Sequence, residues 1–409
     1  MSDSQTIKAS VSSLRGLRDV PASFRLACLM LLRTETGSLR FDLPDGRSIL
    51  FDQGKPGPEA IVQVHDFAFI KQAMASGDIG FAESFMDGHW STPDLTAVLE
   101  FFSENFEAAG KLAVGGSLVK AINNVRHFFN RNSKSGARRN IMAHYDLGND
   151  FYASWLDETM TYSSALFDRP NLSLEQAQRA KYQRIADELG AGPDSHLLEI
   201  GCGWGGFAEY AAQTRGSRVT CLTISEAQRE FAMERMQKAG LSDRVDIRLE
   251  DYRDHEGEYD GVASIEMFEA VGESYWPSYF DKVRQSLKDS AKAALQIITI
   301  DDDLFKRYRK RADFIQRYVF PGGMLPSEEA LKASFNTAGL RYNGVHYFGL
   351  DYARTLKLWA QRFEEAWSDI QTMGFDERFR RLWRFYLSYC EAGFRSGRIN
   401  VGQFQLARA

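Results

Sequence analysis

The sequence has few of the features that mark disulfide-stabilised, metal-binding or membrane-spanning proteins. Its four cysteines are isolated from one another, and its seven histidines form no His-x-x-x-His pair. Because zinc clusters and disulfide frameworks need paired spacing, we expect no metal site and a reducing compartment. The apolar run Leu26–Leu32 is bounded by arginines and is far shorter than the roughly 20 residues that cross a bilayer. No small-residue cleavage site follows it, so the run predicts a helix core rather than a signal peptide.

Net charge is small as well. The chain has 50 Lys and Arg against 55 Asp and Glu, a net charge of −5, which gives no overall attraction to nucleic acid. We therefore expect no nucleic-acid partner. Two local clusters mix cations with aromatic residues, within 305–314 and 378–385. They fit either docking on anionic phospholipid headgroups or a salt-bridged helix surface, and both interpretations stay open.

Length and composition predict two domains joined by a linker. A chain of 409 residues has room for two or three domains. The pattern predicts a small α+β domain over 1–110, a basic linker rich in Gly, Ser and Arg over 111–140, and a catalytic domain over 141–409. Within the first domain we expect helices at Ser12–Thr34, Phe67–Ala75 and Leu95–Ala109, and strands at Ser38–Pro44, Arg47–Asp52 and Glu59–Val64.

The catalytic domain alternates helical and buried strand patterns from about Gln176. The expected helices are Ala177–Leu189, Ala208–Gln213, Glu226–Ala239 and Tyr275–Leu287, with a helical stretch over Leu356–Gly397. The expected strands are His196–Ile200, Arg218–Thr223, Val245–Leu249, Gly261–Ile265 and Ala293–Ile300. This alternation predicts the α/β class, with a doubly wound, mostly parallel sheet.

The strongest local motif is Leu197–Gly206, in which an apolar strand carrying the acid Glu199 breaks into a glycine turn that opens a helix. Glycines at 201, 203 and 205 allow close approach of the backbone to a cofactor, and the helix N-terminus offers unpaired N–H groups. A dinucleotide site would show Gly-x-Gly-x-x-Gly and an acid about 20 residues later. The spacing here is Gly-x-Gly-x-Gly, which resembles motif I of the S-adenosylmethionine-dependent methyltransferases.

Further motifs make the resemblance more specific. From about residue 70 onward, the chain resembles the cyclopropane fatty acid and mycolic acid synthase family of these methyltransferases. The motifs that carry the resemblance are Gly77–Gly88, His144–Asp150, Tyr162–Ser164, Glu199–Gly206, Leu222–Ser225 with Gln228, Asp251–Asp254, Phe268–Glu269, Phe320–Ser327 and Phe348–Tyr352. The resemblance implies a Rossmann-like catalytic domain with helical lipid-binding additions. The smaller N-terminal domain, which resembles a sterol-carrier-like fold, is then assigned to lipid interaction.

The resemblance also assigns the cofactor residues. S-Adenosylmethionine is the implied cofactor and S-adenosylhomocysteine the product derived from it. The implied contacts are Tyr162, Ser163, Glu199, Gly201 and Gly203 to the methionine part, Thr223 and Gln228 to the ribose, and Asp251 and Tyr252 to the adenine. For Asp251 a purely structural role in a turn stays open.

The catalytic set departs from that of the ring-forming members. In those, a bound bicarbonate removes a proton from the transferred methyl group and closes the ring. Glu269 and Tyr352 are retained here, whereas Ser164 replaces a cysteine, Gln296 replaces a histidine and Glu266 replaces a glycine. The departure resembles the hydroxymycolate methyltransferase branch, whose extra glutamate fills the bicarbonate space. We therefore expect Glu266 to supply the anion, with no bicarbonate cofactor, although a solvated loop position stays open for it.

These features predict methyl transfer to the double bond of an unsaturated phospholipid acyl chain through a carbocation. The expected product is a methyl- or methylene-branched chain of the furan fatty acid precursor type. Cyclopropane synthesis is the alternative, followed by a small-molecule methyltransferase and a non-catalytic lipid-binding protein. We expect a cytoplasmic enzyme, peripheral on the inner face of the cell membrane, that meets an anionic membrane surface, and we leave a homodimer open.

Overall fold

The computed structural model describes residues 6–105 and 147–409. The predicted linker 111–140 and the first residues of the His144–Asp150 motif lie outside the described residues. Internal contacts divide the described chain into two compact units. The first comprises 6–105, 311–314 and 374–396, and the second comprises 147–310, 315–373 and 397–409.

The first unit is built on a five-stranded sheet of order β1-β3-β2-β4-β5. Its strands are β1 Thr6–Lys8, β2 Ser38–Asp42, β3 Ser48–Asp52, β4 Glu59–Val64 and β5 Trp90–Ser91. Two of the predicted strands form a hairpin: β2 and β3 pair antiparallel around Gly46, whose φ of 86° is accessible to glycine without strain. Helices α1 Val11–Arg15, α2 Ala22–Leu31, α3 Ala68–Ser76, α4 Asp78–Met86 and α5 Leu95–Glu104 complete the N-terminal part. The single helix predicted over Ser12–Thr34 is wrong, because Gly16 and Pro21 separate α1 from α2.

The long amphipathic helix α19, Glu377–Arg395, also belongs to the first unit. Thr96 of α5 donates to the Glu391 carboxylate at 3.0 Å, and Arg381 donates to the Phe85 carbonyl at 3.0 Å. The sequence boundary places this helix in the catalytic domain, whereas packing groups it with α4 and α5. The first unit, defined by its contacts, therefore draws on three separate parts of the chain.

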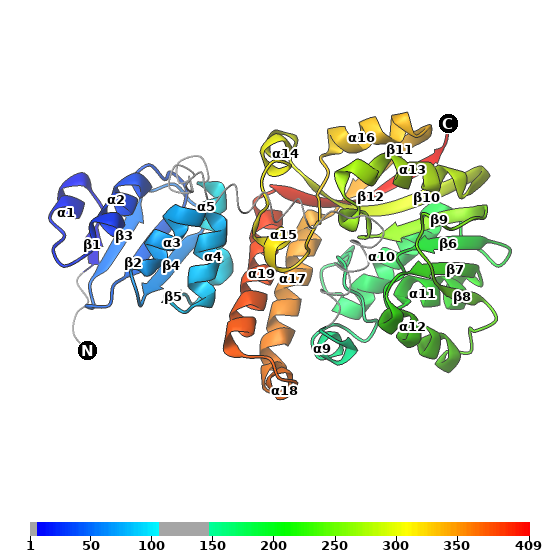
Figure 1. The fold of residues 1–409 in the computed structure, drawn as a ribbon, viewed down its shortest axis with the longest axis horizontal. Coiled ribbons are helices and arrows are strands. Elements are labelled where there is room, and N and C mark those ends of the chain that lie inside the picture. The colour runs from blue at the N-terminus through cyan, green and yellow to red at the C-terminus, as the bar shows by residue number, and fades with distance from the viewer. Residues whose placement is uncertain (1–5, 106–146) are drawn as a thin grey trace. The chain divides into compact units, whose positions relative to one another are not determined.

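The second unit is built on a seven-stranded sheet of order β11-β12-β10-β9-β6-β7-β8 (Figure 1). Its strands are β6 His196–Ile200, β7 Arg218–Thr223, β8 Val245–Leu249, β9 Tyr259–Ile265, β10 Leu287–Ile300, β11 Leu340–Tyr347 and β12 Ile399–Arg408. Strands β6 to β10 pair in parallel, and β12 runs antiparallel between β10 and β11. The predicted parallel sheet is confirmed, but β11 and β12 were not predicted.

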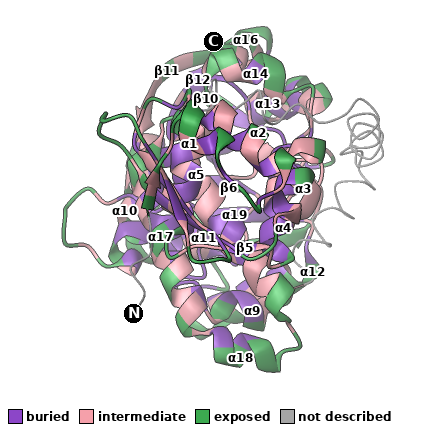
Figure 2. Ribbon diagram, turned by 90° about the vertical axis from the view of Figure 1, so that its left-hand side faces the viewer, coloured by how far each residue is buried: buried purple, intermediate pink, exposed green. Residues whose placement is uncertain are grey.

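The second unit also contains helices, several of which pack against the sheet. They are α9 Asn149–Ala153, α10 Leu174–Leu189, α11 Gly206–Arg215, α12 Glu226–Lys238, α13 Trp276–Gln285, α14 Asp302–Tyr308, α15 Phe314–Tyr318, α16 Glu328–Thr337, α17 Gly349–Glu365 and α18 Trp367–Thr372. Short 3-10 turns, η1 Phe268–Ala270 and η2 Glu273–Tyr275, precede α13. Helix α16 buries Leu331 and Phe335, one turn apart, and exposes its other face (Figure 2). Among the described residues no helix is long and apolar enough to cross a bilayer.

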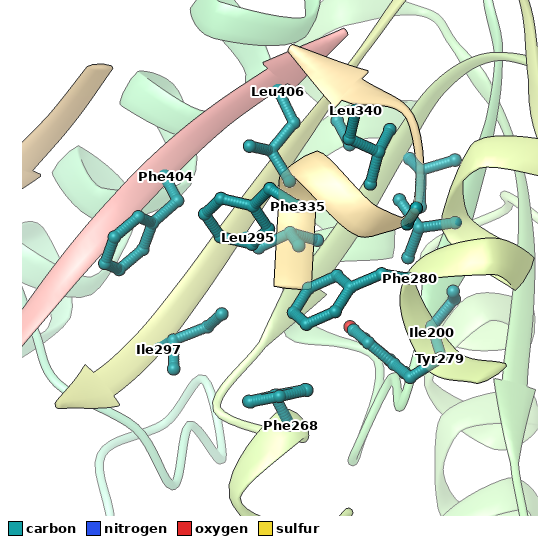
Figure 3. Close-up of a cluster of buried hydrophobic side chains, with 14 of the residues drawn as sticks. Ile200, Phe268, Tyr279, Phe280, Leu295, Ile297, Phe335, Leu340, Phe404 and Leu406 are labelled. Carbon is teal, nitrogen blue, oxygen red and sulfur yellow. The ribbon is translucent and has the colours of Figure 1, made fainter. Parts of the chain in front are cut away.

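The core on one side of the large sheet holds the catalytic segments in place. Figure 3 shows side chains of β10 and β12 meeting those of η1, α13 and α16. The labelled members are Ile200, Phe268, Tyr279, Phe280, Leu295, Ile297, Phe335, Leu340, Phe404 and Leu406. Because Phe268 is buried in this cluster, the turn that carries the neighbouring Glu269 is anchored to the core.

Candidate active site

The glycine turn after β6 forms an open cradle. Gly201, Gly203 and Gly205 have φ of 81°, 52° and 82°, a left-handed conformation that favours glycine. A β-carbon on Gly201 would lie 2.4 Å from the Met267 side chain, so packing within the protein also requires this glycine. A β-carbon on Gly203 would meet no described atom within 4 Å. The space beside Gly203 is therefore open to a ligand, as the predicted cofactor site requires.

Polar groups gather at the carboxyl ends of the neighbouring strands. At the end of β7, Thr223 donates its hydroxyl proton to the Gln228 side-chain oxygen at 3.1 Å. Glu199 is buried within β6, and burial raises the pKa of its carboxyl to about 8. After β8, the Asp251 carboxylate accepts two hydrogen bonds from the Arg253 guanidinium, and Tyr252 packs on Tyr279. The Arg253 pair gives Asp251 a structural role of its own, and its adenine contact stays a prediction.

Aromatic rings surround Tyr162. Its ring centroid lies 5.4 Å from that of Trp359 and 6.4 Å from that of Phe320, onto which it stacks. Tyr152 and Trp155 lie at 5.3 and 5.7 Å. The negative faces of such rings attract a cation. This arrangement suits both a sulfonium and a carbocation.

The carboxylate of Glu266 is the centre of a buried polar cluster. Its Oε1 accepts the Ser164 backbone N–H at 2.8 Å and the Gln296 side-chain amide at 2.7 Å. Its Oε2 accepts the Tyr352 hydroxyl at 2.6 Å. The structure thus brings together four of the five predicted catalytic residues, from a loop, the end of β9, β10 and α17. Glu266 itself has φ of 50°, which is uncommon for a residue other than glycine.

Glu269, the fifth predicted residue, lies in η1. Its Oε1 accepts the Ile298 backbone N–H at 2.6 Å, and its Oε2 has no hydrogen-bond partner among the described residues. Burial, with the Glu266 charge as a smaller contribution, raises the pKa of Glu269 to about 8. Burial also raises the pKa of Glu266, but the Tyr352 hydroxyl, Lys181 and the other two donors oppose it. Glu269 therefore keeps its proton at neutral pH, while the three donors favour the ionised form of Glu266.

Sequence reasoning missed Lys181, which lies fully buried on α10. Its Nζ donates to the Ser163 hydroxyl at 2.6 Å. Burial lowers the pKa of Lys181 to about 7, against the opposing charges of Glu266, Asp157 and Glu199. A signal was present in the sequence, because Lys181 falls four residues from both Ala177 and Ile185 on the apolar stripe of the helix.

The basic clusters are largely paired. In the first, Arg309 pairs with Glu273 and Arg311 pairs with Asp78, while Lys306 and Lys310 are exposed. In the second, Arg378 pairs with Asp87, and Arg380 and Arg381 pair with Glu377. No group of three or more candidate metal ligands occurs within 6–105 or 147–409.

Three features together define an S-adenosylmethionine-dependent methyltransferase. They are the mostly parallel sheet with antiparallel β12 inserted, the glycine cradle after β6 and the polar groups at the strand ends. Residues 132–404 match the family described as mycolic acid cyclopropane synthetase. The chain belongs to this family. The predictions of family, fold class, enzyme class and cofactor are confirmed.

Relatives span nearly the whole chain. The chain is 38% identical over 422 residues to the tuberculostearic acid methyltransferase UfaA1 of Mycobacterium tuberculosis, covering 99% of this chain and 98% of that protein. It is 35% identical over 351 residues to the cyclopropane-fatty-acyl-phospholipid synthase of Escherichia coli, covering 85% and 88%. The solved cyclopropane synthase MmaA2 of M. tuberculosis aligns with a TM-score of 0.62 and 30% identity, covering 66% of this chain and 98% of that one.

Proposed function

We propose that this enzyme methylates the double bond of an unsaturated phospholipid acyl chain and yields a methyl- or methylene-branched product, of the kind that leads to furan fatty acids. The observation that carries the proposal is the Glu266 carboxylate, buried and held by three donors. A fixed anion in this place performs the role that the ring-forming relatives give to bicarbonate. The names of the two relatives, a tuberculostearic acid methyltransferase and a cyclopropane-fatty-acyl-phospholipid synthase, support the substrate class.

The residues around Glu266 and Tyr162 determine where the positive charge of the intermediate is stabilised and which group accepts its proton. S-Adenosylmethionine supplies the electrophilic methyl group. The π electrons of the alkene form the new carbon–carbon bond, and the chain is left as a carbocation. The rings of Tyr162, Trp359 and Phe320 and the Glu266 carboxylate stabilise that cation.

The hydrogen bonds of Glu266 select one oxygen as the proton acceptor. The Ser164 N–H and the Gln296 NH2 group donate to Oε1 and occupy both of its lone pairs, so that oxygen cannot take a proton without losing one of these partners. The Tyr352 hydroxyl beside Oε2 can either donate or accept. Oε2 therefore receives the proton from a carbon next to the cation, the carbon–hydrogen electrons form an alkene, and the Tyr352 hydroxyl turns to accept. A base tethered in this way removes a proton only where its side chain reaches.

The experiment that tests the product is mass spectrometry of lipids from cells that express this chain and receive an isotope-labelled methyl donor. We expect labelled methyl- or methylene-branched acyl chains. Purified enzyme should also turn over without added bicarbonate. A labelled cyclopropane as the sole product, with turnover that requires bicarbonate, would overturn the proposal.

Cyclopropane synthesis is the second candidate, because Glu269 and Tyr352 are retained and the E. coli relative is a synthase of that kind. The triple variant Glu266→Gly, Gln296→His, Ser164→Cys separates the two. It reopens the bicarbonate space and restores the residues of the ring-forming members. We expect it to make bicarbonate-dependent cyclopropane that the wild type does not make.

The membrane is the proposed place of work, at the inner face of the cell membrane and reached from the cytoplasm. Residues 1–110, with the helical lipid-binding additions and the exposed Lys306 and Lys310, supply the proposed lipid contacts. Attraction to anionic headgroups decays over about 10 Å at 0.1 M salt. Sedimentation with anionic vesicles should therefore weaken steeply as salt rises. Equal binding to neutral vesicles at every salt concentration would contradict this, and light scattering would test the proposed homodimer.

A further inference from the structure

Strand β12 brings a second glutamine behind the active-site glutamine. Gln403 lies directly opposite Gln296 in the antiparallel pairing of β10 and β12. Both side chains are fully buried. The Gln403 Nε2 donates to the Gln296 Oε1 at 3.1 Å, and the Gln296 Nε2 donates to the Glu266 Oε1 at 2.7 Å. The two amides thus form a chain of donors that ends on the carboxylate.

The direction of this chain matters because a glutamine amide has two different ends. Rotation about its last bond exchanges the NH2 group, which only donates, for the carbonyl oxygen, which only accepts. If the Gln296 amide turned over, its oxygen would face the Glu266 Oε1 and its NH2 would face the NH2 of Gln403. Each of those contacts sets like partial charges together in a buried place, where unpaired polar groups are costly.

We infer that Gln403 is a positioning residue, which fixes the Gln296 amide so that it donates to the Oε1 of Glu266. This inference rests on the proposed function of Glu266. The donor held on Oε1 keeps the proton off that oxygen and leaves Oε2, beside the Tyr352 hydroxyl, to receive it. Without Gln403, one of the two contacts that oppose the turned-over Gln296 amide is lost, so the orientation that does not support the reaction becomes less costly.

A double-mutant cycle between the two glutamines tests the inference. Gln403→Met keeps the length of the side chain and removes the donor. Because Gln403→Met loosens the hydrogen bond from the Gln296 amide to the charged Glu266 carboxylate, we expect this variant to lower kcat roughly ten-fold. The KM for phospholipid vesicles and the Kd for S-adenosylmethionine should stay within two-fold of wild type. In a Gln296→Met background the same change should have no further effect on kcat.

The matched control is Gln405→Met, the same substitution two residues along the same strand. Gln405 is only partly buried and makes no side-chain hydrogen bond with the described residues, so its kcat should be that of wild type. If Gln403→Met does not fold, Gln403→Asn keeps an amide that is too short to reach Gln296, and the same results are expected. Equal loss of kcat in both Gln296 backgrounds, or an unchanged kcat, would overturn the inference.

The readout is release of S-adenosylhomocysteine, which counts every turnover whatever the lipid product. A wild-type enzyme that makes cyclopropane with bicarbonate would refute the proposed function in the lipid analysis. Additive single variants would refute the positioning role in the cycle. The two failures are therefore distinguishable.

Discussion

Glu266→Gln tests the negative charge at the centre of the proposed mechanism with little change of shape. The new amide oxygen still accepts from the Ser164 N–H and the Gln296 amide, and its NH2 faces the Tyr352 hydroxyl, which can turn to accept. Cofactor binding and thermal stability should therefore change little. A unit charge at roughly 4 Å from the cation contributes about 4 kcal/mol at an effective dielectric constant of about 20. Since about 1.4 kcal/mol is ten-fold in rate, turnover should fall roughly a thousand-fold.

The assay follows S-adenosylhomocysteine release from unsaturated phospholipid vesicles, with calorimetry of S-adenosylmethionine binding alongside. The control is Glu188→Gln, which removes a carboxylate of α10 that is paired with Arg184. It should turn over within two-fold of wild type. A Glu266→Gln enzyme that keeps more than a tenth of wild-type turnover would show that the charge does not act on the transition state.

Three further variants test the surroundings of Glu266. Because the pKa of Glu269 is raised from 4.5 to about 8, the unfolded chain releases a proton that the folded protein retains between these values, so wild-type stability to urea should fall as pH rises through this window. The buried Glu199 carboxyl contributes a similar fall, so Glu269→Gln should make the fall shallower without removing it, and an unchanged slope in the variant would contradict the prediction. Lys181→Met removes a positive charge that lowers the pKa of Glu266. The pKa of Glu266 should therefore rise, and the acid limb of the kcat/KM profile should move to higher pH. A uniform loss of kcat/KM at every pH would indicate that Lys181 has a packing role alone. Gly203→Val should abolish S-adenosylmethionine binding. The control is Gly190→Val, at a helix C-cap with φ of 67° and equally open space among the described residues; it carries the same backbone strain and should bind the cofactor normally. Loss of binding in both variants would refute the assignment of the glycine turn to the cofactor.

The parallel part of the large sheet could be predicted because its strands are short apolar runs. The predicted bounds of β6, β7 and β8 agree with the structure. Strand β12 escaped prediction because Asn400, Gln403 and Gln405 interrupt its apolar pattern. Gln403 is polar because it faces the active site rather than the core. The polar residue Gln403, to which we assign the positioning role, is therefore also a reason why the sequence pattern did not predict the strand.

The site could be predicted in outline because strand ends converge at one edge of a parallel sheet. Motif spacing alone could not show that Ser164, Gln296 and Tyr352 converge on Glu266, since these hydrogen bonds join residues 102, 30 and 86 positions apart. Lys181 was missed for another reason. A lysine in a helix is normally solvent-exposed, and here the hydroxyl of Ser163 and the nearby carboxylates make its burial tolerable.

The left-handed backbone of Glu266 has a consequence for how this family diversifies. At φ of 50° a glutamate is strained by roughly 1–2 kcal/mol, and glycine, which the resemblance assigns to this position in the ring-forming members, is not. A turn of this shape therefore suits glycine intrinsically, and the side chain is kept against the preference of the backbone. An ancestor with glycine would have lost stability on acquiring the proposed base, whereas a change from glutamate back to glycine would gain stability. Without selection for the proposed branched product, drift should favour a return to glycine, and directed evolution should select Glu266→Gly readily.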